Sequence, residues 1–223
     1  MSNSRLFLVL ACVSSVVTGC ATATKKPDYD YTAFREADPR SVLIVPAVNR
    51  SVQVDAPDFF LATITRPAAE RGYYVYPVHM VKRLLEDDGL SDADMVHSAD
   101  TVRLAELFGA DSVLYVSIEQ WNAKYVFVST TVTVEFDYLL KDGKTGEELW
   151  RSRESRVYTP SSSSTGNAIA DLIAGAVTAA ATKAAPNYVP LSTQANQEAV
   201  TEAHHGVPAG PYHADYKKDL DLF

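Results

Sequence analysis

Thr131-Val-Thr-Val-Glu-Phe-Asp-Tyr-Leu-Leu140 carries the clearest structural pattern in this sequence. Two sets of side chains alternate along it, one apolar and one polar: Val132, Val134, Phe136 and Tyr138, and Thr131, Thr133, Glu135 and Asp137. Successive side chains of a β-strand point to opposite faces of the sheet. The stretch therefore predicts a strand with one buried and one solvated face, as is common in antiparallel sheets.

The segments on either side extend this strand to an antiparallel meander. Residues 142–146, Asp-Gly-Lys-Thr-Gly, predict a turn, and residues 147–158 a returning strand. Leu149 and Trp150 are expected on opposite faces of that strand. Residues 112–121 predict a long strand on the other side, while residues 122–130 fit either the end of that strand or an apolar loop.

The preceding segment mixes strands with a helix. Residues 42–45, Val-Leu-Ile-Val, form a short continuous apolar run, as in a strand covered on both faces. A helix is expected to begin near Asp55 and to stop at Gly72, with Pro67 kinking or breaking it near Thr63. The helix would place Phe60, Ile64 and Ala68 on one face. Residues 73–77 predict a second strand.

Two further helices follow in the pattern. One has an apolar stripe of Val81, Leu84 and Leu85 and ends at Gly89. The other, over residues 100–108, directs these side chains inward: Leu104, Leu107 and Phe108. The order β-α-β-α-α followed by a meander predicts a mixed α/β (α+β) domain with one mixed sheet packed by helices.

The C-terminal part opens with a serine-rich break at residues 161–166. Residues 167–185 predict an alanine-rich helix, which lies either on the sheet or against another subunit. A second, polar helix is expected near residues 193–203. Residues 206–213 must form turns, because they contain two glycines and two prolines. These turns could clasp the body or contact a partner.

The first 20 residues predict export and lipidation. Arg5 precedes an apolar run that ends in small residues, which is typical of a secretory signal. The run is shorter than the ~20 residues that span a bilayer. Val17-Thr-Gly-Cys20 resembles the lipobox of bacterial lipoproteins, so Cys20 is the expected lipid attachment site. In bacterial lipoprotein sorting, an aspartate after the lipidated cysteine signals retention in the inner membrane. This chain has Ala21 at that position, so its resemblance to that rule favours the outer membrane.

These patterns divide the chain into four parts. Residues 1–19 are the signal peptide, 20–40 the lipidated N-terminus and tether, 41–160 the mixed body, and 161–223 C-terminal helices and a tail that pack on the body. The tether could instead be an ordered arm, docked through its aromatic side chains: Tyr29, Tyr31 and Phe34.

Charge and cysteine content narrow the range of partners. Removal of Arg5 with the signal leaves 19 basic and 28 acidic residues, which argues against a nucleic-acid partner. Cys12 also leaves with the signal, so lipidation of Cys20 leaves no thiol for a disulfide.

Catalytic and cofactor motifs are missing from the sequence. Gly143-Lys-Thr lacks the upstream glycine of a phosphate-binding loop, and no Gly-x-Ser-x-Gly motif occurs. One cluster has metal-ligand residue types: His204, His205, His213 and Asp215. Adjacent histidines on a helix diverge by ~100°, so solvated or capping histidines are the favoured interpretation. We therefore predict a non-enzyme without a metal or cofactor.

Four ordered motifs carry a resemblance to a known family: residues 71–78, 108–115, 145–150 and 208–216. Together they resemble a family of bacterial lipoproteins of unknown function that includes a meningococcal vaccine-candidate antigen. Its members are encoded beside CsgG-like secretion lipoproteins. The resemblance implies a fold similar to the N-terminal domain of TolB, to CsgG and to PelC. Ala214 replaces the proline usual in the last motif.

The combined expectation is a non-enzymatic accessory or scaffold subunit of an envelope secretion or transport complex. It would face the periplasm from the outer membrane, with a CsgG-like lipoprotein or further copies of itself as partner. The alternative is a lipoprotein that binds or hydrolyses envelope glycans or lipids, which predicts a deep pocket with convergent polar groups. Candidate partner contacts are the following residues, of which the two tryptophans could instead pack in the core: Trp121, Trp150, Pro211, Tyr212 and His213.

Overall fold

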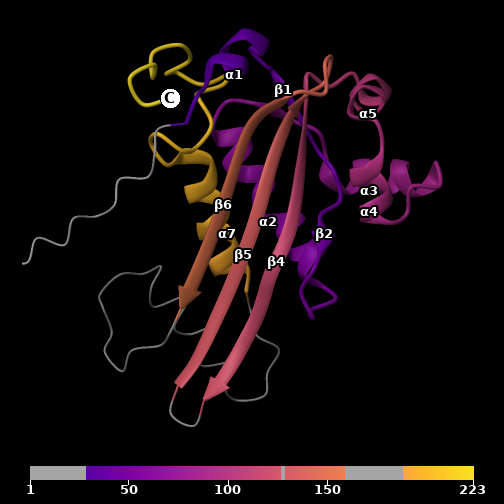
Figure 1. Ribbon diagram of the computed structural model, residues 1–223, viewed down its shortest axis with the longest axis vertical. Coiled ribbons are helices and arrows are strands. Elements are labelled where there is room, and N and C mark those ends of the chain that lie inside the picture. The colour runs from indigo at the N-terminus through magenta and orange to yellow at the C-terminus, as the bar shows by residue number, and fades with distance from the viewer. Residues whose placement is uncertain (1–28, 127–128, 159–187) are drawn as a thin grey trace, which may run out of the picture.

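The computed structural model describes residues 29–126, 129–158 and 188–223 (Figure 1). The predicted signal peptide, Cys20 and the predicted helix at residues 167–185 lie outside these ranges. They remain predictions.

One mixed sheet forms the body, with strand order β3-β1-β4-β5-β6 and β2 paired to β4 beside this path. The strands are β1 (Ser41–Ile44), β2 (Val48–Asn49), β3 (Tyr74–Val75), β4 (Ser112–Val126), β5 (Ser129–Asp142) and β6 (Glu148–Tyr158). Strand β1 runs parallel to β3 and β4, whereas β4, β5 and β6 form an antiparallel meander. The predicted fold class is confirmed, and residues 122–126 continue the strand rather than forming a loop.

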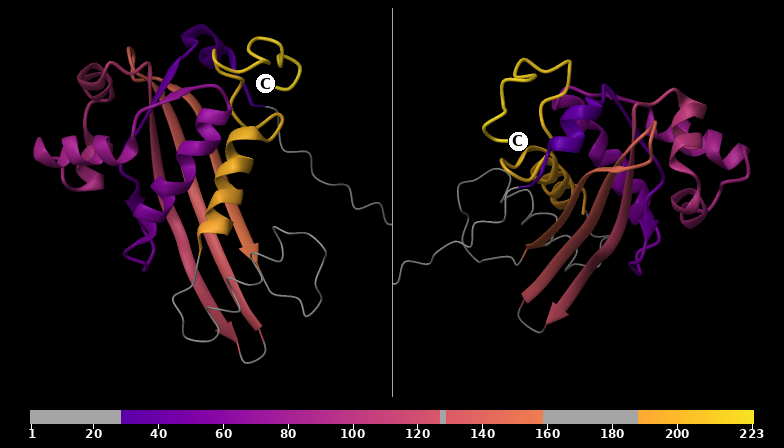
Figure 2. Two further views of the ribbon diagram at one scale, coloured as in Figure 1. Left: turned by 180° about the vertical axis from the view of Figure 1, so that it is seen from behind. Right: turned by 45° about the horizontal axis from the view of Figure 1, so that its top comes forward.

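Helices cover the sheet unevenly. They are α1 (Thr32–Ala37), α2 (Ala56–Glu70), α3 (Val78–Asp87), α4 (Ala93–Ser98), α5 (Thr101–Phe108) and α7 (Val189–Thr201). Helices α2 and α7 lie side by side over one face of the sheet, and α3, α4 and α5 gather at its other side (Figure 2). The C-terminal segment ends close to α1 (Figure 1).

The apolar side chains that alternate along β5 form one wall of the main core. Its apolar side chains are all buried against α2 and α7: Val132, Val134, Phe136 and Tyr138. On the opposite, solvated face Arg153 of β6 pairs with Asp137 of β5. The prediction of one buried and one solvated face is confirmed.

Strand β1 lies between two separate cores. Val42 and Ile44 belong to the main core, whereas Leu43 and Val45 pack with side chains of α3, α4 and α5 on the other side. This double coverage explains why residues 42–45 are apolar without alternation.

Helix α2 continues across Pro67, so of the two predicted outcomes, a kink or a break near Thr63, the break is wrong. Proline removes one helical hydrogen bond, the one to the carbonyl of Thr63. Burial of Phe60, Ile64 and Pro67 itself against the core outweighs that loss.

Two leucines predicted to face inward are exposed. Leu84 of α3 is 49% exposed and Leu107 of α5 is 57% exposed. Helix α3 buries Val78, Val81 and Leu85 instead, which follow one narrow stripe. Helices α3 and α5 are short, and each packs on the sheet along one narrow face. Leu84 and Leu107 lie beside that face and stay exposed.

Strand β6 departs from strict alternation near its start. Leu140 pairs with Trp150, but Lys141 pairs with Glu148, so Leu149 is an extra residue in a β-bulge. Leu149 and Trp150 consequently both turn into the main core, at 3% and 2% exposure. The prediction that they lie on opposite faces is wrong.

The segment predicted as a tether is partly ordered. Tyr31 and Phe34 are 5% and 4% exposed, and α1 packs on the body. From Tyr29 onward the docked-arm alternative is therefore correct. Helix α7 also differs from expectation: it begins at Val189 and buries Leu191 and Ala195, so it is not polar throughout. In the described part of the chain, no helix has the length and apolar character to cross a bilayer.

Candidate functional site

The arm (residues 29–40) and the tail (residues 202–223) lie side by side at one end of the molecule (Figure 1). The Tyr31 hydroxyl donates to the Gly206 carbonyl at 2.7 Å. Arg35 Nη2 donates to the Leu220 carbonyl at 3.3 Å. We call this contact region the arm–tail junction.

A second set of contacts in the junction converges on Asp38, at the end of α1. Tyr216 Oη donates to its carboxylate at 2.7 Å, and Lys217 Nζ lies 2.9 Å from Oδ2. Desolvation alone would raise the pKa of Asp38. Hydrogen bonds from Lys217 and Tyr216, together with positive charge from Lys217 and Arg40, outweigh it and hold the pKa below its ordinary value.

Arg71, which follows α2, binds the tail from the body side. Its Nε donates to the Val207 carbonyl at 2.7 Å, and its Nη2 lies 2.7 Å from Asp219 Oδ2. The guanidinium also lies 4.4 Å from the centre of the Phe223 ring. The side chains of Arg71 and Asp219 are only 11% and 8% exposed, so this ion pair is buried.

Gly72 allows the tail to approach the body closely. Its φ is +89°, and a β-carbon there would lie 2.5 Å from the β-carbon of His213. The tail accordingly bonds backbone to backbone, with Gly210 N–H donating to the Arg71 carbonyl and Tyr212 N–H to the Gly72 carbonyl. Tyr73 Oη donates to the Pro208 carbonyl at 2.5 Å. The motifs at residues 71–78 and 208–216 thus contact each other, and the tail clasps the body.

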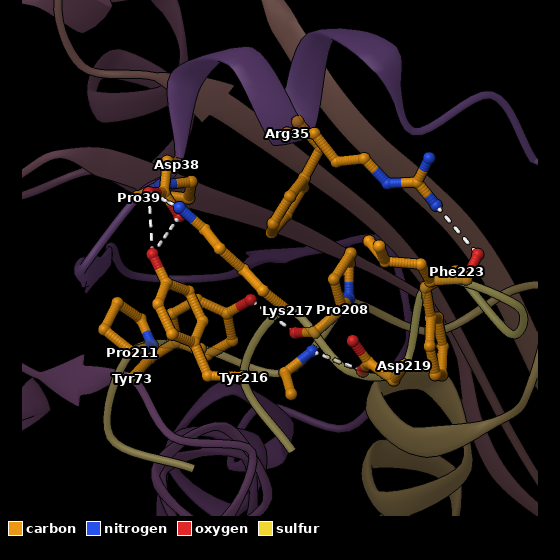
Figure 3. Close-up of a pocket in the computed structure, with 14 residues that line it drawn as sticks. Arg35, Asp38, Pro39, Tyr73, Pro208, Pro211, Tyr216, Lys217, Asp219 and Phe223 are labelled. Carbon is orange, nitrogen blue, oxygen red and sulfur yellow. Dashed lines mark hydrogen bonds and ion pairs between the residues drawn. The ribbon is translucent and has the colours of Figure 1, made fainter. Parts of the chain in front are cut away.

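A cavity of about 210 Å³ lies within the junction, between α1 and the tail (Figure 3). Aromatic, proline and leucine side chains form most of its wall: Phe34, Pro39, Tyr73, Pro208, Pro211, Leu220 and Phe223. Four charged residues also line it: Arg35, Asp38, Lys217 and Asp219. Burial raises the pKa of Tyr73, so its phenol stays a neutral donor.

Unusual backbone conformations also gather here. Among the described residues, three that are not glycine have positive φ: Asp38 at 44°, Lys217 at 57° and His204 at 65°. All three belong to the arm or the tail, and His204 N–H donates to the Leu222 carbonyl. Each such conformation costs roughly 1–2 kcal/mol, so the surrounding contacts must hold it in place.

Both tryptophans predicted as candidate partner contacts are buried. Trp121 is 0% exposed and stacks on Phe59, with ring centres 6.1 Å apart. Trp150 is 2% exposed and donates from Nε1 to the His205 carbonyl at 2.7 Å. Both tryptophans pack in the core, as the alternative interpretation expected, and neither side chain is exposed to a partner in this structure.

The other predicted site residues lie on the tail. Pro211 lines the cavity, while Tyr212 projects at 70% exposure. His213 Nδ1 accepts from the Asp215 backbone N–H at 3.1 Å. Within the described ranges, histidine, cysteine and carboxylate side chains form no group of three placed to hold a metal ion.

Sequence reasoning missed the residues that build the junction, namely Arg35, Asp38, Arg71, Lys217 and Asp219. Only Arg71 could have been suspected from the sequence, because it is the first residue of one of the four motifs. The others are charged residues in polar stretches, and no local pattern distinguishes them.

Comparisons with known proteins fit this architecture. A family model for GNA1162-like lipoproteins matches residues 29–212. Lipoprotein NMB1124/NMB1162 of Neisseria meningitidis serogroup B is 29% identical over 204 residues, covering 92% of this chain and 95% of the relative. The crystal structure of lipoprotein GNA1162 from Neisseria meningitidis matches with a TM-score of 0.55 and 29% identity, over 66% of this chain and 100% of that one.

A weaker match is to the solved structure of a dodecameric protein. The PelC dodecamer from Paraburkholderia phytofirmans matches with a TM-score of 0.44 and 15% identity, over 71% of this chain and 83% of that one. A likeness this distant carries no functional conclusion.

Proposed function

Because the chain belongs to the GNA1162-like lipoprotein family, we propose that it is a membrane-anchored, non-enzymatic subunit of an envelope secretion or transport complex. In this proposal Cys20 carries the lipid, and the body scaffolds or gates the complex. Two or more acyl chains suffice for stable anchoring, so the body needs no other membrane contact.

The arm–tail junction is the observation that carries this proposal. Because the arm is docked from Tyr29 onward, nine residue steps separate the body from Cys20. A chain of that length reaches at most ~30 Å. A body held within this distance stays close to the membrane surface, which suits a subunit that contacts neighbouring envelope proteins.

The ionisable groups around the cavity favour a structural role over catalysis. Asp38 is bound by Lys217 and Tyr216, and Asp219 is bound by Arg71. Both carboxylates line the cavity, but each is held by a side chain that fastens the tail to the arm or to the body. The alternative of a glycan- or lipid-binding or hydrolytic lipoprotein predicts a pocket of ~300–1,000 Å³ with convergent polar groups. The cavity of about 210 Å³ falls below that range.

The resemblance to a family encoded beside CsgG-like lipoproteins supports a CsgG-like lipoprotein, or further copies of this chain, as the partner. Ala21 supports an outer-membrane location with the body facing the periplasm. The solvated face of the meander offers charged side chains, among them Glu135, Asp137 and Arg153. Charged side chains are typical of the solvated rim of an interface rather than of its core.

Site-directed photocrosslinking in intact cells tests the proposal. A crosslinker replaces Tyr212 at the tip of the tail, or Arg153 on the solvated face, at 70% and 64% exposure. We expect adducts with a CsgG-like lipoprotein or with a second copy of the chain, identified by mass spectrometry. Met80, which is 64% exposed on α3, is the matched control and should give fewer adducts. A chain that stays monomeric and forms no envelope adduct from either position contradicts the proposal.

A further inference from the structure

The loop that leads into α2 exposes an apolar patch. Val52 and Val54 are 91% and 83% exposed, and Phe59 in the first turns of α2 is 37% exposed. Val54 directly precedes Asp55, the N-cap of α2. Side chains at the positions of Val54 and Phe59 commonly pack against each other at the start of a helix. We call Val52, Val54 and Phe59 the loop patch.

Hydrogen bonds hold the backbone of this loop in one conformation. Asn49 Nδ2 donates to the Gln53 carbonyl at 2.8 Å, and the Ser51 N–H donates to Asn49 Oδ1 at 3.0 Å. The Gln53 N–H donates to Ser51 Oγ at 3.2 Å. A loop that is already ordered loses little conformational entropy when another surface packs on it. The loop patch is thus a preformed apolar surface.

Trp121 lies next to the loop patch and has a polar group without a partner. Its ring stacks on Phe59, with ring centres 6.1 Å apart, and packs against Tyr188 with ring centres 5.3 Å apart. The Trp121 side chain is buried, and in the described part of the chain its Nε1–H has no hydrogen-bond acceptor. Buried donors nearly always have an acceptor. A group that covers the loop patch is therefore expected to bring a carbonyl or hydroxyl oxygen to Trp121.

Both ends of residues 159–187 lie near Trp121. Tyr188 follows this segment and contacts Trp121. Tyr158 precedes it and lies two strands away from Ala123 of β4, because both pair with the same residue of β5. Two strand spacings, ~10 Å, therefore separate Tyr158 from the strand that carries Trp121. The segment starts and ends at the part of the molecule where the loop patch is located.

The sequence of this segment has a complementary pattern. Residues 167–185 predict a helix with these side chains on one face: Ile169, Leu172, Ile173, Ala176, Val177 and Ala180. Pro186 and Asn187 separate that helix from Tyr188, so its last residue lies within ~10 Å of Tyr188. The last four carbonyls of a helix have no partner within it. They are acceptors of the kind that the Trp121 Nε1–H lacks.

We propose that residues 167–185 form a helix whose apolar face packs on the loop patch of the same chain, and that a carbonyl of its last turn accepts from Trp121 Nε1–H. This places the helix on its own body and not against another subunit. A helix over these residues is ~28 Å long, and the steps from Tyr158 to Asn167 reach ~30 Å, so the connection is long enough. The placement holds whether or not the chain joins a secretion complex.

Paired cysteines test the contact. The one native cysteine of the mature chain is Cys20, the predicted lipid site, so engineered cysteines supply the free thiols. Val54→Cys is combined in turn with Leu172→Cys or Ala176→Cys on the apolar face, and with Thr178→Cys on the opposite face. Mild oxidation in native membranes should join Val54→Cys to an apolar-face position about tenfold faster than to Thr178→Cys, because a docked thiol has a higher effective concentration. Non-reducing gels and mass spectrometry of the linked peptides measure the rates.

Val157→Cys is the matched control. Val157 is 62% exposed and pairs with Thr133, so it lies on the solvated face of the meander, two residues before the segment. A segment without a fixed position would meet Val157→Cys at least as often as Val54→Cys. Equal rates for these two thiols with Leu172→Cys, or equal rates for the two helix faces, overturn the proposal. A disulfide that joins two chains through Val54→Cys shows that a second copy covers the loop patch, which also overturns it.

A second measurement needs no disulfide. Leu172→Gln should increase the rate at which a bulky maleimide modifies Val54→Cys, because a polar side chain weakens the packing that covers the thiol. Thr178→Gln, on the opposite face of the predicted helix, should leave that rate unchanged. Thermal unfolding confirms that each variant is folded. Equal rates in the two variants overturn the proposal.

Discussion

Arg71 holds the tail through three different contacts. It forms a hydrogen bond, a buried ion pair and a cation–π contact, with Val207, Asp219 and Phe223 respectively. Asp219 also accepts from the Ala209 backbone N–H at 2.8 Å. Removing either partner of a buried pair leaves a charge without compensation.

Asp219→Ala should lower the free energy of unfolding by about 3 kcal/mol, because Arg71 and the Ala209 N–H then stay buried without a partner. Urea unfolding followed by circular dichroism measures the change. Asp215→Ala, on an exposed carboxylate of the same tail, should change stability by less than about 0.5 kcal/mol. Equal effects of the two substitutions would show that the buried pair does not hold the tail.

His97 of α4 makes stability depend on pH. Burial lowers its pKa, although the hydrogen bond to the Pro46 carbonyl at 3.0 Å opposes the shift. Because the pKa is lower in the folded than in the unfolded chain, the unfolded chain binds the proton first as the pH falls. His97 therefore leaves the free energy of unfolding unchanged above about pH 6.5 and lowers it as the pH falls below that value.

The urea midpoint should be lower at about pH 5.5 than at about pH 7.5. His97→Gln should reduce that difference. His79→Gln, at an exposed position on α3, is the matched control and should leave it unchanged. A pH dependence that is identical in His97→Gln and in the wild-type chain contradicts this assignment.

The sequence reveals individual residues only where the chemistry is local. Cys20 belongs to a short contiguous motif and Gly72 ends a helical stripe, so their predicted roles needed no tertiary information. Gly72 does lie just after the end of α2, with a φ of 89°. Arg71 and Asp219 are 148 positions apart, and neither flanking sequence specifies the other. Their pairing follows from the path of the tail, which contains no repeating element to predict.

A buried polar network links helices α2 and α7 to strand β5. Tyr138 Oη donates to Asn196 Oδ1 at 2.6 Å, and Asn196 Nδ2 donates to Thr63 Oγ1 at 2.8 Å. Thr63 and Ser192 share a further hydrogen bond at 2.8 Å. Burial raises the pKa of Tyr138 well above its ordinary value, so the phenol stays protonated and can donate. The network fixes how the two helices sit on the sheet.

Asn196→Ala should cost about 2–3 kcal/mol of stability, because it leaves the Tyr138 hydroxyl buried without an acceptor and removes a donor to Thr63. Chemical denaturation measures the loss. Thr193→Ala, at an exposed position of α7, is the control and should change stability by less than about 0.5 kcal/mol. A loss below about 0.5 kcal/mol for Asn196→Ala would mean that packing alone positions α7.

Long periodic elements were predictable, and short or irregular ones were not. Strand β5 alternates over its central ten residues, and that period determines which face is buried. Strands β2 and β3 have two residues each, too few to show a period, so β2 was missed and β3 was predicted too long. The bulge at Leu149 turns Leu149 and Trp150 to the same face of the sheet, and no residue type in the sequence marks that bulge. Tertiary pairing, not propensity, sets such features.

For the molecule as a whole, the predicted lipid attachment determines where the body can act. Cys20→Ala should abolish palmitate labelling and release the exported chain from the membrane fraction, because no acyl chain remains to bind the bilayer. Metabolic labelling and membrane fractionation measure both effects. Ser14→Ala, within the predicted signal peptide, is a control that should keep both labelling and membrane binding. A labelled, membrane-bound Cys20→Ala chain would disprove the assignment.

The hydrogen bond from Tyr216 to Asp38 joins positions 178 residues apart. A polypeptide leaves the ribosome and the translocation channel amino end first, so Asp38 and Phe34 emerge long before the tail. During that interval the arm has no clasp, and Phe34 and Tyr73 stay open to chaperones and proteases. A copy truncated near its end would remain in that state. The junction therefore reports that residues 202–223 have been synthesised, since only a chain that contains them can close it.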